Sequence, residues 1–416
     1  MTSLNLKKLL SAPQLKIGIA VGASGLSQAV LVLVPTFNLD VKNASNLVLW
    51  QSLSTGAGIL LSSILGVFTF SRILLNSTND VEFSPDYADL LPNFMYFFSI
   101  VLLVLLPISF SLFETDKLSL TFFLAISLLG FLFMAVQRNY YAAIADWNSV
   151  SFQFGIDGVV RLIATFVIVT YFESTVFVLI LASVLSQVLS IALPSLISPW
   201  WNGFKKSTNK FHVFIIEVLP LVSTTLGSLA LTTFPPVFLK ALGSPIELVT
   251  ALGVLMILMR MPSTVLNPLV IPQVREISQH HLKGLYDSEF RLFSNIVLKL
   301  FLFAIPTATF MSVIAIKFIP SGENVITLNQ VDALTRLLLV LIGTFFVVEG
   351  FANSCINGQS RFMESGLVYF VATCLFLTSL NVVGNSLISV LAMLLLATTF
   401  VFVWLFIRIY TGSRSG

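Results

Sequence analysis

Arg260 is the residue of this sequence whose position most needs a chemical explanation, because it lies inside the apolar run 248–272. A helix of about 25 residues crosses a hydrocarbon core of roughly 30 Å, so Arg260 would lie near the bilayer midplane. An arginine at the centre of a membrane helix costs about 2.5–3.5 kcal/mol. We therefore expect its side chain to face a polar cavity, a counter-ion or an anionic ligand. Pro262, Pro268 and Pro272 follow closely and predict a bent helix whose freed carbonyls are satisfied by neighbours or water.

A second arginine lies in the N-terminal half with polar residues at helical spacing. Gln153, Asp157 and Arg161 follow one another at four-residue intervals, which places them on one face of a helix. An ion pair between Asp157 and Arg161 would neutralise two groups that are costly in a membrane. In the alternative interpretation, Arg161 is partly free to meet an anion in a cleft.

Ionisable groups of the C-terminal half recur at a common depth. Glu217, Lys299 and Glu349 would each lie a few residues inside their helices. A structural Lys–Glu pair accounts for one glutamate and leaves a surplus carboxylate that titrates or binds a cation. Asn353, one turn beyond Glu349, would add an oxygen ligand. The spacing of the histidines and cysteines does not resemble a metal site.

The first apolar run carries small and polar residues. Its glycines are typical of close helix packing. Ser24, Ser27 and Gln28 place three hydrogen-bonding groups at mid-depth and favour a wet face. Such weakly polar walls suit the passage of a sugar better than the binding of a metal.

The composition predicts an all-α, polytopic membrane protein. Hydrophobic residues make up 56% of the 416 residues and charged residues 10%, well below the roughly 25% typical of soluble domains. The mean hydropathy is +0.97. Apolar runs predict twelve membrane helices, at 15–36, 47–70, 91–113, 118–137, 152–172, 175–197, 212–235, 248–272, 293–318, 333–356, 365–383 and 386–408.

The distribution of charge predicts the topology. If the N-terminus is cytoplasmic, most Lys and Arg residues fall in cytoplasmic segments, as the positive-inside rule expects. Twelve helices then return the C-terminus to the cytoplasm. The net charge of +3 reflects this bias, so no nucleic-acid partner is expected.

A basic, aromatic segment divides the chain near its midpoint. We predict an N-terminal six-helix lobe at 1–198, a cytoplasmic linker at 199–210 and a C-terminal six-helix lobe at 211–416. Transporters built from two halves place their substrate site between them, so we expect a central cleft.

Three short motifs resemble the multidrug/oligosaccharidyl-lipid/polysaccharide (MOP) exporter superfamily, in particular its Wzx-type flippases of lipid-linked oligosaccharides. The first is Arg260-Met261-Pro262 followed by Pro268 and by Pro272-Gln273-Val274-Arg275-Glu276-Ile277-Ser278; the others are Gly155-Ile156-Asp157-Gly158-Val159-Val160-Arg161 and Gly25-Leu26-Ser27-Gln28. Gln273 departs from the pattern, in which a basic residue is frequent at this position.

The resemblance implies a polyprenyl-pyrophosphate glycan, such as an O-antigen precursor, whose head group enters the cleft from the cytoplasm while its tail stays in lipid. Arg260 and Arg161 would hold the pyrophosphate, with Ser24 and Gln28 lining the glycan path. Glu217 and Glu349, with Asn353, are candidates for coupling to Na⁺ or H⁺, and Asp157 and Lys299 for structural pairing. No cofactor is expected. The expected partners are the cytoplasmic membrane, the glycan substrate and other polysaccharide assembly proteins.

Other functions stay open. A multidrug/toxin extrusion antiporter shares the twelve-helix plan, although intramembrane arginines suit anionic cargo better than cationic drugs. A membrane glycan polymerase or ligase would normally need a large outer loop with catalytic carboxylates, and the expected outer loops are short. We therefore expect a transporter and not an enzyme. A scaffold without transport activity is a further alternative, with little reason to hold Arg260.

Overall fold

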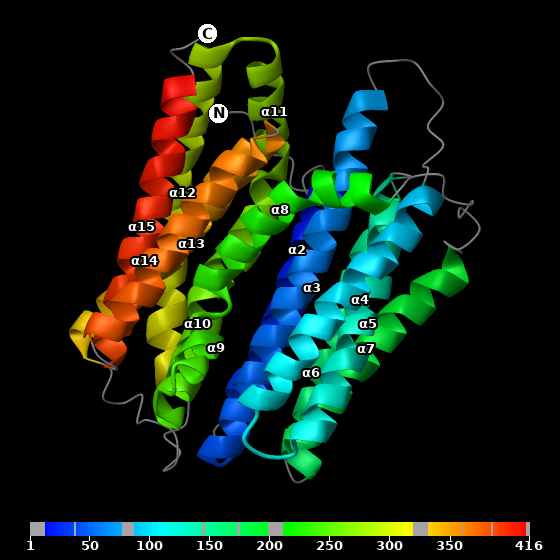
Figure 1. Ribbon diagram of the computed structural model, residues 1–416, viewed down its shortest axis with the longest axis vertical. Coiled ribbons are helices and arrows are strands. Elements are labelled where there is room, and N and C mark those ends of the chain that lie inside the picture. Colours follow the sequence, from blue (N-terminus) through cyan, green and yellow to red (C-terminus); the bar gives the residue numbers. More distant parts are fainter. Residues whose placement is uncertain are drawn as a thin grey trace, which may run out of the picture. The chain divides into compact units, whose positions relative to one another are not determined.

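The computed structural model describes the backbone of residues 13–36, 39–76, 87–143, 146–172, 175–198, 211–318, 332–359, 361–383 and 386–412 (Figure 1). Helices account for almost all of these residues. They are α2 (Pro13–Thr36), α3 (Val41–Asn76), α4 (Tyr87–Leu112), α5 (Lys117–Ala143), α6 (Trp147–Tyr171), α7 (Val176–Ile197), α8 (Phe211–Thr232), α9 (Pro235–Ala241), α10 (Ile246–Leu266), η2 (Asn267–Val270), α11 (Ile271–Leu282), α12 (Tyr286–Phe318), α13 (Ala333–Gly358), α14 (Phe362–Val383) and α15 (Leu387–Gly412).

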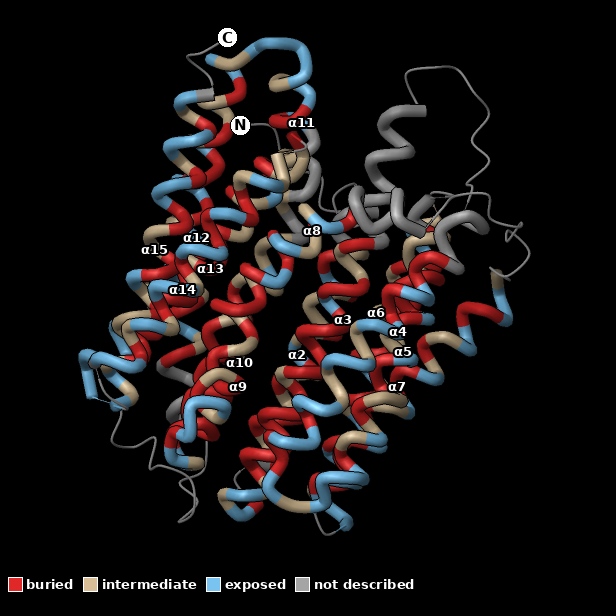
Figure 2. Tube along the Cα trace, viewed as in Figure 1, coloured by how far each residue is buried: buried red, intermediate tan, exposed pale blue. Residues whose placement is uncertain are grey.

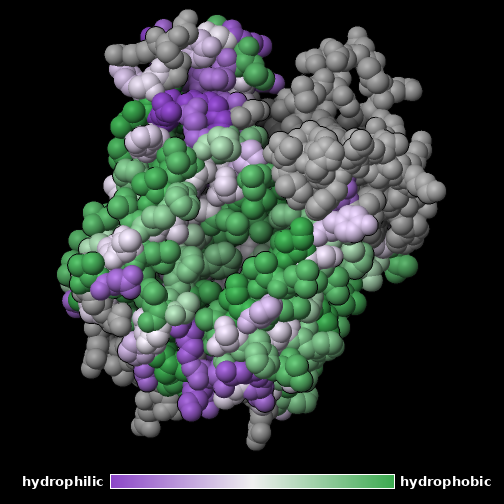
Figure 3. Space-filling model, in the orientation of Figure 1, coloured by the Kyte–Doolittle hydropathy of each residue, from purple (hydrophilic) through white to green (hydrophobic). Residues whose placement is uncertain are grey.

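The helices confirm the predicted class of fold. Among the described residues, eleven helices are long and apolar enough to cross a membrane, and a bent pair raises the number to twelve. Large apolar side chains such as Leu103, Leu196 and Val382 are 74%, 80% and 83% exposed, as lipid-facing residues are. Figure 3 shows hydrophobic side chains along the middle of the helices and hydrophilic ones gathered near their ends.

The seventh span is broken where the sequence predicted one helix at 212–235. Residues Val218–Thr232 and Pro235–Ala241 form two helices that meet at 78°. Pro235 and Pro236 begin α9, where the missing amide donors of proline are tolerated. Because a helix cannot run through these prolines without losing hydrogen bonds, the chain turns before them.

The eighth span also ends earlier than predicted. It was expected to continue to Pro272, but α10 stops at Leu266 and the 3₁₀ helix η2 follows. Asn267 keeps helical dihedrals, with φ −61° and ψ −40°. The next residue, Pro268, has no backbone N–H to donate, so the α-helical hydrogen bonds are interrupted there. Pro272 lies in the first turn of α11 and so begins a helix instead of ending one.

Several helices extend beyond their apolar runs. The second span was predicted at 47–70, whereas α3 covers Val41–Asn76; the ninth was predicted at 293–318, whereas α12 begins at Tyr286. Asp287 and Glu289 occupy the first turn of α12, where carboxylates favour a helix N-terminus. Hydropathy therefore located these spans but not their ends.

The chain divides into two compact units. Unit 1 comprises Met1–Leu31 and Leu49–Thr225, and unit 2 comprises Val32–Val48 and Leu226–Gly416. Unit 1 thus includes residues 211–225 of the predicted C-terminal lobe, and unit 2 includes residues 32–48 of the predicted N-terminal lobe. The predicted linker, 199–210, lies outside the described residues.

In unit 1, α6 packs most extensively against α7, and α5 contacts α4, α6 and α7. Helix α6 also approaches α2 very closely at Gly158. A Cβ atom added at Gly158 would lie 2.9 Å from the backbone nitrogen of Ser24, closer than such contacts normally are. This glycine therefore brings the face of α6 that carries Asp157 against α2.

In unit 2, α13 is the central helix and packs against α10, α12 and α15. Its buried residues extend from Thr335 to Ile356. Figure 2 shows buried and exposed residues on different faces of the helices. Phe351 of α13 stacks on Phe293 of α12 with ring centroids 5.6 Å apart. Gly343 lets α13 approach α10, because a Cβ there would lie 3.2 Å from the carbonyl oxygen of Met259. The two candidate polar sites lie on α6 and on α10 with α13.

Candidate functional site

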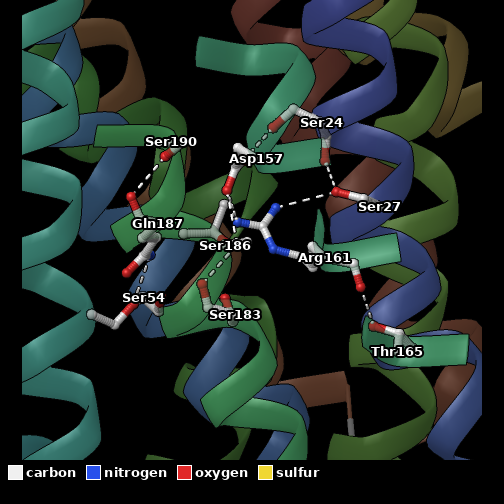
Figure 4. Close-up of polar contacts among 12 residues, drawn as sticks. Ser24, Ser27, Ser54, Asp157, Arg161, Thr165, Ser183, Ser186, Gln187 and Ser190 are labelled. Atoms are coloured by element: carbon white, nitrogen blue, oxygen red, sulfur yellow. Dashed lines mark hydrogen bonds and ion pairs between the residues drawn. The ribbon is translucent and has the colours of Figure 1, made fainter. Parts of the chain in front are cut away.

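Asp157 and Arg161 of α6 form the ion pair that their spacing predicted. Both residues are only 1% exposed. Ser24 of α2 donates a hydrogen bond to Asp157 Oδ2 at 2.7 Å. The hydroxyl of Ser186 on α7 lies 3.0 Å from Asp157 Oδ1 (Figure 4). The carboxylate of Asp157 is therefore satisfied by three helices of unit 1.

The guanidinium of Arg161 is also enclosed. Its NH1 group donates to Ser27 Oγ at 3.3 Å, and the Ser27 hydroxyl donates to the carbonyl of Ser24 at 2.7 Å. Its Nε is buried without a hydrogen-bond partner, so water does not reach this side of the group. Of the two interpretations of Arg161, the structure supports the ion pair with Asp157.

This geometry corrects two of the predicted substrate contacts. Arg161 and Ser24 were expected to meet the pyrophosphate or the glycan, but both are buried inside unit 1 and bonded to Asp157. Their spacing is visible in the sequence, whereas the rotation of α6 toward α2 and α7 depends on tertiary packing. Gln28 differs, since it is half-buried and forms no hydrogen bond with the described residues.

Arg260 of α10 has a different environment. It is half-buried, and its side chain forms no ion pair or hydrogen bond with any residue that the structure describes. None of its three guanidinium nitrogens is fully buried, so its donors are partly accessible. Only its backbone carbonyl is engaged, by Ser263 at 2.8 Å and Thr264 at 3.1 Å.

Glu349 of α13 does not neutralise Arg260. Gly343 opposes Met259, the residue before Arg260, whereas Glu349 lies six residues beyond Gly343. The two charged residues are therefore offset by at least five residues along these helices, which is about 7.5 Å of helix rise. This offset agrees with the lack of an ion pair between them among the described contacts.

Glu349 is nevertheless an unusual carboxylate. It is 1% exposed, and its Oε1 accepts a hydrogen bond from the hydroxyl of Tyr369 on α14. Its Oε2 is buried and has no partner among the described residues. An unmet carboxylate oxygen at this position is suited to a proton or a cation.

Lys299 was predicted to pair with one of the two glutamates, Glu217 or Glu349, and it does not pair with Glu349. Lys299 lies on an exposed face of α12 and forms no ion pair with a described residue. Asn353 was expected to add an oxygen ligand beside Glu349. Its Oδ1 instead accepts from Ser365 Oγ at 2.5 Å and from Asn357 Nδ2 at 3.2 Å, so it is already used.

Glu217 lies in α8, but its side chain is outside the described residues. Within the described part of the chain, no cluster of three or more His, Cys, Asp or Glu residues is suited to hold a metal ion.

Sequence reasoning missed two partners of these acids, Ser186 and Tyr369. Serine is common in membrane helices as a packing residue, so Ser186 carried no separate signal. Tyr369 did carry one, because a tyrosine buried in an apolar helix normally finds a hydrogen-bond partner for its hydroxyl.

Comparison by sequence gives no match: no protein-family model matches the chain, and no curated protein is similar enough to match it. Comparison by structure gives clear matches. A eukaryotic MATE transporter, AtDTX14, aligns with a TM-score of 0.70 at 12% identity, over 96% of this chain and 95% of that one.

Two further solved structures share the fold. An inward-facing MATE family transporter of the MOP superfamily aligns with a TM-score of 0.61 at 13% identity, over 98% of this chain and 96% of that one. The lipid II flippase MurJ, in an inward closed conformation, aligns with a TM-score of 0.60 at 14% identity, over 96% and 90%. The chain therefore has the fold seen in these MATE transporters and in MurJ.

Proposed function

We propose that this protein is a MOP-type transporter that flips a lipid-linked oligosaccharide, or a related polysaccharide precursor, across the cytoplasmic membrane. The fold it shares with MATE transporters and MurJ supports a transporter. The resemblance of its short motifs to Wzx-type flippases supports the cargo. In this proposal both termini are cytoplasmic and two lobes alternate in exposing the substrate.

The observation that carries the proposal is the accessible guanidinium of Arg260. It lies two-thirds of the way along α10, which is long and apolar enough to span a membrane. A cation at such depth is costly unless something compensates it, and no described side chain does so. The pyrophosphate of a polyprenyl-linked glycan would supply that compensation when it is bound.

The chemistry of arginine suits this task. Its planar guanidinium offers parallel N–H donors that match phosphate oxygens in a bidentate arrangement. Gln28 remains a candidate contact for the glycan, since its amide has no described partner. The Asp157–Arg161 pair is assigned to holding α6 against α2 and α7, and not to the substrate.

Glu349 is proposed to couple transport to Na⁺ or H⁺, alone or with Glu217. Its Oε2 lacks a partner and its carboxylate is enclosed, which favours a group that gains a proton or a cation during the cycle. If Glu217→Gln and Glu349→Gln both leave transport and its ion dependence intact, this part of the proposal is wrong.

A cation-coupled multidrug antiporter is the second candidate. It is favoured by the similarity to AtDTX14, at a TM-score of 0.70, and by the buried Glu349. It is disfavoured by Arg260, because an accessible cation repels cationic drugs. A membrane glycan polymerase or ligase is a third and weaker candidate.

Deletion of the gene separates these functions. If the protein is a flippase, the deletion strain accumulates lipid-linked intermediates inside the cell and loses surface glycan, and its drug susceptibility is unchanged. An antiporter deletion raises drug susceptibility and leaves the glycan intact. Absence of accumulated intermediates in the deletion strain contradicts the proposed function. Neighbouring glycosyltransferase genes would add independent support.

A further inference from the structure

Arg138 is a second cation without an ion pair among the described residues, and it belongs to unit 1. It lies in α5, three residues before the end of the candidate span Lys117–Tyr141. This position corresponds to the edge of the hydrocarbon core, where the phosphates of lipid head groups lie. Trp147, at the start of the next helix, is 39% exposed, as interfacial tryptophans are.

A chain of amide hydrogen bonds holds Arg138 in place. Gln137 Nε2 donates to the carbonyl oxygen of Ile191 at 3.1 Å and to Ser195 Oγ at 2.8 Å. Gln153 Nε2 donates to Gln137 Oε1 at 2.7 Å, and Arg138 Nε donates to Gln153 Oε1 at 3.1 Å. The Ile191 carbonyl at one end only accepts, and the Arg138 guanidinium at the other end only donates. Both ends therefore require that each glutamine amide points its NH₂ group toward Ile191 and its oxygen toward Arg138.

The aromatic ring of Phe154 fixes the plane of the guanidinium. Arg138 Cζ lies 3.6 Å from the centre of this ring, a cation–π contact that covers one face. With Nε used by Gln153, the edge that carries NH1 and NH2 forms no hydrogen bond with a described residue. Arg138 is half-buried, and neither of these nitrogens is fully buried.

The nearby acids are engaged elsewhere. Asp157 pairs with Arg161, so one carboxylate serves two arginines in this part of unit 1. Asp146 caps α6 by accepting from the Ser149 amide at 3.1 Å and the Ser149 hydroxyl at 2.6 Å. Arg161 and Arg138 therefore share the charge of Asp157, and Arg138 forms no ion pair of its own among the described residues.

Lys16 adds a second cation at the same end of unit 1. Its Nζ lies 3.5 Å from Asn148 Oδ1, in the first turn of α6, five residues before Gln153 and six before Phe154. Two cations at this end of unit 1, Arg138 and Lys16, are suited to a doubly charged anion.

We propose that Arg138 binds a phosphate group of a membrane lipid through NH1 and NH2, at a site in unit 1 separate from Arg260. The ligand class is a lipid phosphomonoester or pyrophosphate. It has two sources, the pyrophosphate of a polyprenyl-linked cargo and the head group of a resident anionic lipid. The amide chain and Phe154 hold the guanidinium ready for this ligand.

Binding to the full-length protein in phosphatidylcholine nanodiscs tests the proposal, with a short-chain polyprenyl pyrophosphate and phosphatidic acid as the two probes. Every variant also carries Arg260→Ala, so the proposed transport site does not contribute and the outcome is independent of the proposed function. Arg138→Gln is expected to weaken binding about ten- to a hundred-fold, because two charge-assisted hydrogen bonds are lost. Lys117→Gln, at the other end of α5, is the matched control.

The two probes distinguish the sources. A loss confined to the polyprenyl pyrophosphate identifies the cargo lipid, and a loss for both probes identifies a general lipid phosphate site. Gln153→Glu keeps Arg138 but sets a carboxylate against it, so it should weaken binding as well. If Arg138→Gln does not fold, Arg138→Lys gives the test, with a loss of about three- to ten-fold expected from a cation that cannot bind in bidentate fashion. Binding that stays within two-fold of the Lys117→Gln control overturns the proposal.

Discussion

Arg161 and Arg260 lie in apolar helices of similar length, yet the structure places them in opposite chemical situations. Arg161 is 1% exposed and paired with Asp157, and its NH1 group donates a hydrogen bond to Ser27. Arg260 is half-buried and has no described partner for its side chain. The first arginine is part of the scaffold of unit 1, whereas the second is available to a ligand.

The difference shows that membrane depth alone does not identify a functional arginine. From the sequence, both arginines carry a free-energy cost for burial in the membrane, and the difference between them lies in their neighbours. Asp157 one turn away compensates Arg161, whereas the nearest carboxylate on the helix packed against α10, Glu349, is offset from Arg260 by at least five residues.

Asp157→Ala should destabilise the protein by about 3–5 kcal/mol, because it leaves Arg161 buried without a counter-charge. Arg260→Ala should change the free energy of unfolding by less than about 1 kcal/mol, since a half-buried group with no described partner is removed. Thermal unfolding of the purified variants in detergent measures both. The double variant Asp157→Ala with Arg161→Leu should recover part of the loss. Equal destabilisation by Asp157→Ala and Arg260→Ala would abolish the contrast.

Gly158→Ala should destabilise by about 1–3 kcal/mol, because its Cβ would press on the backbone of Ala23 and Ser24 in α2. Gly155→Ala is the matched control one turn earlier on α6. A Cβ at Gly155 meets no atom within 4 Å, so this variant should be neutral or slightly more stable. The same unfolding assay compares them. Similar effects of the two substitutions would show that α6 is not held against α2 at this point.

Glu349→Gln should change stability by only about 1 kcal/mol, because the amide oxygen still accepts from Tyr369. Its effect should appear in the ion dependence of transport, since the group that gains a proton or cation is removed. Transport measured with an imposed Na⁺ or H⁺ gradient reports this change, with Lys299→Gln as an exposed control. A Glu349→Gln variant that responds to both gradients as the wild type does would remove Glu349 from the coupling step.

The sequence predicted the class of fold and the number of spans, because a run of about twenty apolar residues is typical of a membrane-spanning helix. It did not predict where the helices end. The breaks after Thr232 and Leu266 depend on Pro235, Pro236 and Pro268, whose effect on hydrogen bonding is local. The positions of these prolines in the sequence mark both breaks.

The polar site was only partly predictable. The spacing of Asp157 and Arg161 gave their ion pair, since it involves one helix. Their contacts with Ser24, Ser27 and Ser186 were not predictable, because they depend on how three helices rotate against one another. The Lys299 pairing failed for the same reason: similar depth does not ensure that two side chains face each other.

Flipping of a polyprenyl-pyrophosphate oligosaccharide by the purified protein in liposomes tests whether Arg260 binds the pyrophosphate during transport. Arg260→Ala should reduce the rate at least about a hundred-fold at equal protein content, because the bidentate phosphate contact is lost. Arg260→Lys should also lose most activity, since an ammonium does not reproduce the fork of donors. Arg291→Ala, an exposed arginine of α12, should flip at the wild-type rate. A fully active Arg260→Ala protein would contradict the account.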